Sequence, residues 1–408
     1  MLKPERRTRG DLIAAAAIAT VVLLFLSFFW WRSSTRATVL RPAQTPAPPV
    51  VAAKTVPDAL RQTWRADSSR TRAPLILNGT VVTGYGRTMA GLDSQTGAQR
   101  WSYARDRELC AVSYVYDIAV AVYPDRRGCG QVTGIEAGTG QRGPTRSSYA
   151  DKQVIVRSDG NAVLSYGPTR LELWRSDLVR SLSYGEIDAR IKPVNTGLGE
   201  GCALMSAAAS DTAAAVLESC REEKDLRLTL LKPAKEEDEP DTKRVALPGI
   251  AADSDARVLA VIGTSTAVYL PTPRPAVVVY DDTGTKVAET PLTTAAALGG
   301  GVPAVTRAGE LLTWWTGSAV MVFDDKLKHL YTIEAGGPRA PIGPATVMAG
   351  MLLVPLADGL AVCNKADGAF QRLIPLTHPS GSGPVVPAVA GPTVIEQRGP
   401  MLAGFGPA

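Results

Sequence analysis

The residues best suited to chemistry in this 408-residue chain are its five cysteines, Cys110, Cys129, Cys202, Cys220 and Cys363. Cys202 and Cys220 each lie nine residues from Asp211, on two predicted strands that turn at this residue. The two thiols therefore face each other across a predicted hairpin, which is a favourable position for a disulfide. Buried free thiols are the alternative interpretation, because cysteine is a common small core residue.

The other cysteines are placed by the same reasoning. Cys110 opens one strand of a predicted sheet and Cys129 begins its third strand, so that the two can meet across the end of the sheet. Cys363 lies in the middle of a strand, where we expect an inert core thiol. Two candidate disulfides favour an oxidising compartment outside the cytoplasm.

Metal and acid–base chemistry have few candidate residues. The chain has two histidines, His329 and His378, and neither has a second ligand at a spacing that metal sites use. Asp281 and Asp324 are each followed by a second aspartate, and such pairs suit acid–base work or cation binding. They recur 43 residues apart at the same point of a repeat, so we interpret them as turn acids. The sequence predicts no catalytic residue, no metal site and no cofactor.

A repeat supplies the elements that position these residues. Residues 91–97 read GLDSQTG and residues 134–140 read GIEAGTG, at an offset of 43. Each copy is a strand that ends on an acid, followed by a polar turn with glycine in the left-handed conformation. The matched positions are Gly91, Leu92, Asp93, Thr96 and Gly97 in the first copy, and Gly134, Ile135, Glu136, Thr139 and Gly140 in the second.

Apolar strands fill the intervals between these hairpins and give four strands per repeat of about 40 to 45 residues, the period of a propeller blade. The expected blades start near residues 74, 109, 152, 199, 253, 300, 344 and 382. We therefore predict an all-β, eight-bladed β-propeller, with seven blades as the alternative. The last blade has three clear strands. An orphan strand at residues 61–67, which contains Trp64, can supply the fourth and close the ring.

The stretch GLDSQTGAQRW, residues 91–101, resembles the blade motif of the PQQ-like, or quinoprotein-type, β-propeller family, in which Trp101 takes the final position. The resemblance covers about residues 60–408 and is good only in the first blade, since Pro144 replaces the tryptophan in the second. That family contains quinone-dependent dehydrogenases and also scaffolds, such as the propeller subunit of the bacterial outer-membrane barrel-assembly machine. The chain has neither the adjacent cysteines nor the long insertions of the dehydrogenases, so the resemblance implies a non-enzymatic member.

The N-terminus predicts a membrane anchor. Residues 12–31 are uncharged and, at about 1.5 Å per residue, long enough to cross the roughly 30 Å hydrocarbon core. Trp30 and Trp31 lie at one end, where indoles favour the headgroup region. A cleaved signal peptide is the alternative, but the run is long for one and lacks a small-residue cleavage site. We expect an uncleaved helix that contacts membrane lipid.

The segment after the helix, residues 32–56, is rich in proline and alanine and has no hydrophobic period. Such a segment tends to polyproline II and serves as a semi-rigid spacer. The expected parts are therefore a cytoplasmic tail (1–11), a transmembrane helix (12–31), a linker (32–56) and a propeller (57–408). The net charge of +5 is too small for this length to indicate nucleic acid.

Together these features predict a single-pass protein of the bacterial cytoplasmic membrane, with its N-terminus inside and its propeller outside. We expect a non-enzymatic scaffold for unidentified envelope proteins. Trp314 and Trp315 are adjacent in a strand and point to opposite faces, so one of them is a candidate interface anchor. The alternatives are a quinone-linked dehydrogenase or other propeller enzyme, and a sensor that binds a small ligand in the central channel.

Overall fold

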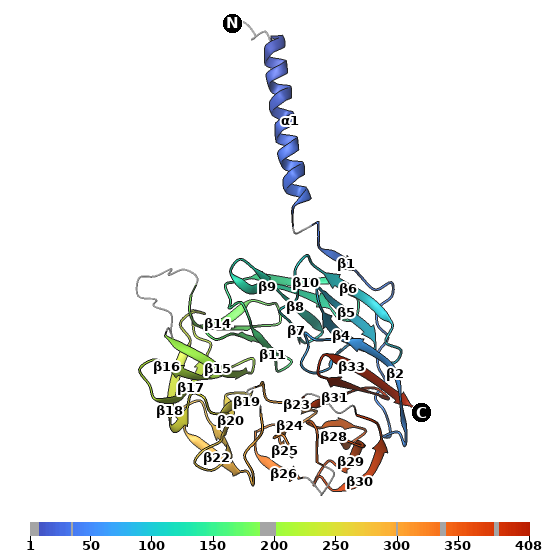
Figure 1. The fold of residues 1–408 in the computed structure, drawn as a ribbon, viewed down its shortest axis with the longest axis vertical. Coiled ribbons are helices and arrows are strands. Elements are labelled where there is room, and N and C mark those ends of the chain that lie inside the picture. Colours follow the sequence, from blue (N-terminus) through green and yellow to red (C-terminus); the bar gives the residue numbers. More distant parts are fainter. Residues whose placement is uncertain (1–7, 34–35, 188–200, 299–300, 335–339, 379–382) are drawn as a thin grey trace.

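The computed structural model describes residues 8–33, 36–187, 201–298, 301–334, 340–378 and 383–408. It contains an N-terminal helix, α1 (Arg9–Trp31), and eight β-sheets arranged in a ring (Figure 1). The predicted all-β, eight-bladed propeller of four-stranded blades is confirmed, and the alternative of seven blades is wrong. Residues 1–7, most of the predicted tail, lie outside the described residues.

We number the blades 1 to 8 along the chain and give the strands of each from the innermost to the outermost. Blades 1 to 4 comprise β3 (Leu75–Leu77), β4 (Thr80–Tyr85), β5 (Thr88–Asp93) and β6 (Gln99–Ala104); β7 (Ala111–Val115), β8 (Ile118–Asp125), β9 (Gly128–Glu136) and β10 (Arg142–Ser147); β11 (Ile155–Ser158), β12 (Val163–Tyr166), β13 (Arg170–Trp174) and β14 (Arg180–Gly185); and β15 (Cys202–Ala209), β16 (Ala214–Cys220), β17 (Asp225–Lys232) and β18 (Asp241–Ala251).

Blades 5 to 8 follow the same order. They comprise β19 (Arg257–Ile262), β20 (Ser265–Leu270), β21 (Ala276–Tyr280) and β22 (Lys286–Pro291); β23 (Val305–Ala308), β24 (Leu311–Trp315), β25 (Val320–Phe323) and β26 (His329–Ile333); β27 (Thr346–Met348), β28 (Met351–Leu356), β29 (Gly359–Asn364) and β30 (Phe370–Pro375); and β31 (Val385–Ala390), β32 (Thr393–Arg398), β33 (Met401–Pro407) and β2 (Leu60–Asp67). Each innermost strand begins one to five residues after the start expected for its blade.

The ring closes as predicted, because the N-terminal strand β2 pairs antiparallel with the C-terminal strand β33. Trp64 of β2 is buried, and its indole N–H donates to the Ser94 carbonyl in blade 1 at 3.0 Å. Trp101 repeats this arrangement one blade further on and donates to the Ala137 carbonyl in blade 2 at 2.8 Å. The two tryptophans therefore link neighbouring blades in the same way.

Glycines of the repeat make room for these indoles. A Cβ on Gly91 would lie 2.2 Å from the Trp101 ring, and a Cβ on Gly404 would lie 2.2 Å from the Trp64 ring. The turn itself depends on Asp93, whose carboxylate accepts the backbone N–H groups of Gln95 and Thr96 at 3.1 and 3.0 Å. The repeat motif is thus a packing and turn motif.

The core lies between blades, where the faces of neighbouring sheets meet. Leu217 and Leu228 of blade 4 pack with Val258 and Val268 of blade 5 in one such cluster of buried aliphatic side chains. Each blade buries both of its faces in this way, which explains why its middle strands are almost continuously apolar. Exposed side chains gather in the turns and on the outer strands.

The segment after α1, predicted to be a semi-rigid spacer, contacts the propeller along its length. Residues 39–41 form a strand, β1 (Val39–Arg41), that pairs with β6 as a fifth strand of blade 1. Residues 42–57, which we call the strap, then cross one face of the propeller from blade 2 to blade 7. Ala43 and Ala47 donate backbone N–H groups to Thr139 and Gly138 of blade 2 at 2.9 and 2.8 Å.

The far end of the strap is held by blade 7. Arg372 of β30 donates to the carbonyls of Val56 and Pro57 at 2.8 and 3.0 Å. In between, Val50 lies against the turn at Gly79 so closely that a Cβ there would be 2.8 Å from its side chain. The hydrogen bonds of the strap are made by its backbone N–H and carbonyl groups. A hydrophobic pattern in the sequence cannot reveal such contacts.

Candidate functional site

Both predicted cysteine pairs are joined in the structure. Cys202 and Cys220 are register partners on β15 and β16, with Cα atoms 4.0 Å apart, and form one disulfide. Cys110 and Cys129 form the other, with Cα atoms 6.1 Å apart. Cys363 is a buried free thiol whose pKa burial raises to about 11. It is therefore protonated at neutral pH, as suits a core residue.

Glu218 is a fully buried carboxylate next to the Cys202–Cys220 disulfide. It accepts hydrogen bonds from the Tyr184 hydroxyl at 2.9 Å, from Arg227 Nε at 2.9 Å and from the Thr229 hydroxyl. The two sulfurs and this carboxylate lie within 4.8 Å of one another. The sulfurs are bonded to each other, and the Arg227 guanidinium already supplies the cation. The group is thus a structural ion pair within blade 4, to which Tyr184 of blade 3 adds a hydrogen bond.

The aspartates of the repeat lie in turns. Asp281 accepts the backbone N–H groups of Thr283 and Thr285 at 2.9 Å each. Asp324 does the same for Lys326 and Lys328 at 2.9 and 2.8 Å. The hydroxyl of Thr283 also donates to Asp281, and this hydrogen bond, with the backbone ones, lowers the pKa of that carboxyl. In blade 2, Glu136 accepts the Thr139 hydroxyl at 3.1 Å.

The adjacent tryptophans point to opposite faces of β24. Trp314 is fully buried and packs on Tyr269 of blade 5, with ring centroids 5.3 Å apart. Trp315 is partly buried and donates its indole N–H to the Pro341 carbonyl at 2.8 Å. Both rings therefore make contacts inside the propeller, and only part of Trp315 reaches solvent.

The two histidines lie in different blades. His329 begins β26 and stacks edge-on against Phe323, and burial lowers its pKa. His378 is buried after β30, and its Nε2 lies 3.2 Å from the buried carboxylate of Glu396. Arg398 Nε donates to the same carboxylate at 2.7 Å. This His378–Glu396 pair has no signal in the local sequence, because a loop and a strand of different blades bring it together.

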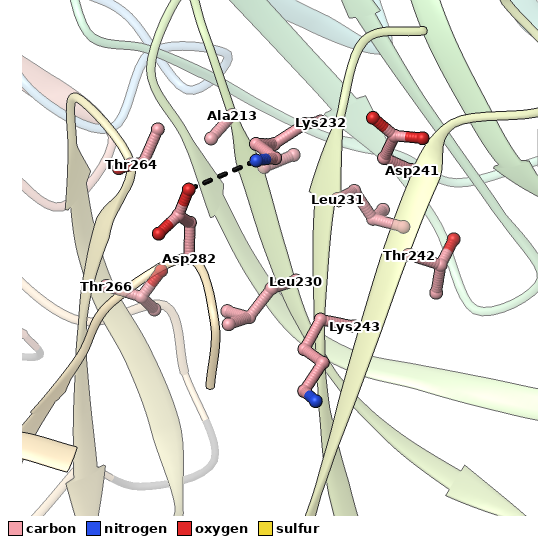
Figure 2. A pocket seen from close by; sticks show the side chains of 11 residues that line it. Ala213, Leu230, Leu231, Lys232, Asp241, Thr242, Lys243, Thr264, Thr266 and Asp282 are labelled. Carbon is pink, nitrogen blue, oxygen red and sulfur yellow. Dashed lines mark hydrogen bonds and ion pairs between the residues drawn. The ribbon is translucent and has the colours of Figure 1, made fainter. Parts of the chain in front are cut away.

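A pocket of about 250 Å³ opens between blades 4 and 5, and we take it as the candidate binding site. Ala213 before β16 and Leu230 of β17, which pack with blade 5, belong to its apolar part, and polar side chains come from β18, from β20 and from the turns before β20 and after β21 (Figure 2). Lys232 crosses it to pair with Asp282 at 3.1 Å. The lining residues are Ala213, Ala214, Leu230, Leu231, Lys232, Asp241, Thr242, Lys243, Thr264, Thr266 and Asp282.

The lining suits recognition of an amphipathic group. Thr264 and Thr266 bring hydroxyls, while Lys243 and Asp241 bring charges of both signs to the rim of its apolar part. A few convergent polar groups around apolar surface are the usual composition of a binding site. The local sequence contains no signal for this site. Lys232 and Asp282 are 50 residues apart, and only the docking of two blades brings them together.

The charged loop between β17 and β18 borders this region. Its Glu237 pairs with Arg180 of blade 3, and the Glu237 carbonyl accepts the Ser183 N–H at 2.6 Å. Arg180 also contacts the buried Glu172 at 3.1 Å. Burial alone raises the pKa of Glu172, but the guanidinium groups of Arg170 and Arg146 more than offset it, so that its pKa is lowered. The loop is thus fastened to blade 3 by an ion network.

A second cavity, of about 290 Å³, lies under the strap. The strap residues Val50, Ala52 and Ala53 form one wall, and Met348 and Ala390 of the inner strands of blades 7 and 8 lie opposite. The strap therefore bridges the inner turns of these blades without filling the space beneath it.

Comparison with known proteins is informative only at the level of the fold. No protein-family model and no curated protein matches the chain. The solved structure of BamB from Moraxella catarrhalis is similar with a TM-score of 0.51 at 13% identity, over 85% of this chain and 100% of BamB. Sqt1 from Saccharomyces cerevisiae is similar with a TM-score of 0.52 at 9% identity, over 88% of this chain and 100% of Sqt1. At these identities the likeness establishes a β-propeller.

Proposed function

We propose that this chain is a single-pass membrane protein of the bacterial cell envelope, whose propeller stands outside the cytoplasmic membrane and holds partner proteins. The observation that carries this proposal is the attachment of α1. The helix has no buried side chain and a mean hydropathy of 2.7 over its most apolar window. Only seven residues separate it from β1, which is part of blade 1. An apolar helix fixed so closely to a folded domain needs a lipid surrounding.

Details of the helix support the membrane assignment. Its 23 residues span about 34 Å, enough for the hydrocarbon core. Arg36 stacks on the Trp31 ring at 4.1 Å, which combines a headgroup-seeking indole with a cation at the end of the helix. Two disulfides favour the outside of the membrane for the propeller.

The side of the propeller that is remote from α1 supports the scaffold role. We call blades 1, 2 and 8, with β1 and the strap, the near side, and blades 4 and 5 the far side. The far side carries the pocket of Figure 2 and outer strands with exposed edges. Such surfaces suit a protein partner that adds a strand or inserts a side chain.

We also propose that the chain is not an enzyme and that its blades follow the PQQ-like pattern. The carboxylates and histidines considered for chemistry have structural partners, as at Glu218, Asp281 and His378. Trp101 packs against Gly91 and Trp64 packs against Gly97, as expected for a blade motif whose role is packing.

The test is photo-crosslinking of the full chain in its native host. A crosslinking amino acid at Thr264, beside the pocket, should yield a few specific envelope proteins. The same group at Ser69, an exposed near-side residue, should not yield them. Membrane fractionation accompanies the experiment: an integral protein stays in the pellet after alkaline extraction. Release by alkali would refute the anchor, and crosslinks to nothing at Thr264 would refute the scaffold surface.

A further inference from the structure

The near and far sides of the propeller carry opposite charge. Residues 32–147, which form the tether (32–38), β1, the strap, β2 and blades 1 and 2, contain 16 Lys and Arg against 8 Asp and Glu. Residues 201–300, which form blades 4 and 5, contain 10 Lys and Arg against 15 Asp and Glu. In Figure 1, α1 and β1 lie on the same side of the ring as β6 and β10, and β22 and β26 lie opposite. The positive side is therefore the side next to the anchor.

Part of this positive charge lies in three turns at one end of blades 1 and 2, which contain Arg87, Arg105, Arg107 and Arg126; we call them the basic turns. Arg87, Arg107 and Arg126 are exposed, and no carboxylate of the described residues pairs with any of the four. The carboxylates nearby are engaged elsewhere: Glu108 pairs with Arg70 at 3.3 Å, and Asp125 with Arg127. Asp106 is the one exposed acid left among them.

The fold places these turns beside the tether. Val39 of β1 is the register partner of Ala104, the residue before Arg105. The Arg87 carbonyl accepts the Arg105 N–H at 3.4 Å and the Tyr123 hydroxyl at 2.9 Å. Tyr123 lies three residues before Arg126, so these bonds hold the three basic turns together. Tyr85, 58% exposed, begins the first of these turns. An aromatic side chain among cations is typical of surfaces at lipid headgroups.

The tether limits how far this surface can stand from the bilayer. Residues 32–38 join Trp31 to Val39, and seven extended residues reach at most about 25 Å. Attraction to an anionic leaflet falls off within a Debye length of about 8 Å at physiological ionic strength. The tether is therefore long enough for the basic turns either to touch the bilayer or to stand clear of it. The attraction between their charges and the lipid headgroups then favours contact.

We propose that the basic turns of blades 1 and 2 bind the anionic headgroups of the membrane in which α1 is anchored, so that the ring stands on its near side and turns its far side away from the bilayer. This rests on the membrane anchoring proposed above. Each arginine held near an anionic surface favours contact by about five-fold, so three exposed arginines favour it by roughly a hundred-fold.

The test uses the full chain, reconstituted through α1 into vesicles of phosphatidylcholine with or without phosphatidylglycerol, and a quencher on the lipid headgroups. Fluorophores are attached at Ser69→Cys, next to Arg70, or at Thr264→Cys on the far side; the one free thiol, Cys363, is buried. Quenching at Ser69→Cys should rise several-fold with phosphatidylglycerol and fall in high salt. Quenching at Thr264→Cys should stay low.

The variant Arg87→Glu/Arg107→Glu/Arg126→Glu should abolish this rise, and the neutral variant with glutamine at the same positions should reduce it. The matched control, Arg221→Glu/Lys224→Glu/Arg274→Glu, changes the net charge equally at exposed far-side residues and should leave it intact. Equal quenching with and without phosphatidylglycerol, or equal loss in the control, overturns the inference. A chain that does not float with vesicles refutes the anchor itself. Circular dichroism verifies that each variant is folded.

Discussion

The near and far sides of this propeller are built from the same blade but finished differently. On the near side, β1 pairs with the outer edge of β6, so that the edge of blade 1 is closed. On the far side, β22 is the outermost strand, and residues 286–289 are exposed. A blade therefore normally ends in an outermost strand with an unpaired edge. In blade 1 the N-terminal segment pairs with that edge through β1. Open edges are where another chain can add a strand.

The largest expected effect comes from the seam that joins the chain ends on the near side. Trp64→Ala removes a buried indole that packs on Gly404 and Gly97 and links blade 8 to blade 1. We expect the free energy of unfolding to fall by about 3 to 5 kcal/mol. Denaturant unfolding measures it. Tyr85→Ala, an exposed near-side aromatic, is the control and should stay within about 0.5 kcal/mol. A similar small loss for Trp64→Ala would show that the ring does not depend on this seam.

The two disulfides give a second, smaller contrast, because each side has one and the sequence separations, 19 and 18, are almost equal. Loops of this size predict a loss of about 3 kcal/mol for either Cys→Ser pair. Unfolding of the Cys110→Ser/Cys129→Ser and Cys202→Ser/Cys220→Ser variants checks this. Equal losses would mean that loop closure dominates. A much larger loss for the far-side pair would mean that the disulfide also supports the buried Glu218 beside it.

The seam at Trp64 and both cysteine pairs were predicted from the sequence. Turn acids, left-handed glycines and buried indoles act within one or two hairpins, so the repeat predicted eight blades, the ring closure and the facing cysteines. The path of the strap was not predictable, since its contacts are backbone groups of a proline-rich chain. Lys232–Asp282 and His378–Glu396 were missed because contacts between blades depend on the ring, and no local spacing encodes them.

A buried phenol on the border of the far side should make stability fall at alkaline pH. Burial, with the neighbouring Glu218 carboxylate, raises the pKa of Tyr184 to about 12, from a usual value of about 10. The folded state keeps the proton longer, so this contribution is complete below about pH 10 and is lost as the pH rises to about 12. We expect roughly 2 kcal/mol, which Tyr184→Phe should remove from the pH profile. An unchanged alkaline slope in that variant would exclude Tyr184 as the cause.

A smaller effect tests how the near side holds the strap. Arg100 donates to the carbonyls of Thr45 and Pro46 at 3.3 and 3.0 Å and pairs with Asp93 at 3.4 Å. Arg100→Gln should weaken the docking by about 1 to 2 kcal/mol, the contribution of charge-assisted hydrogen bonds. Limited proteolysis within residues 42–57 should then be about ten-fold faster, and the exposed Arg65→Gln should not change it. Equal cleavage in both would mean that the strap is held by its backbone contacts alone.

The smallest effect is expected at the ion pair that crosses the far-side pocket. The Lys232 and Asp282 side chains are 41% and 38% exposed, so water screens their attraction. A double-mutant cycle with Lys232→Met and Asp282→Asn should give a coupling of about 0 to 1 kcal/mol that decreases with salt. Lys286 and Glu289, 55% and 49% exposed, are a matched pair on the same side and should give the same range. A coupling above about 2 kcal/mol at Lys232–Asp282 alone would mean that the pair is shielded from water. The far-side pocket would then be held closed by its own charges, and an entering partner would first have to break that pair.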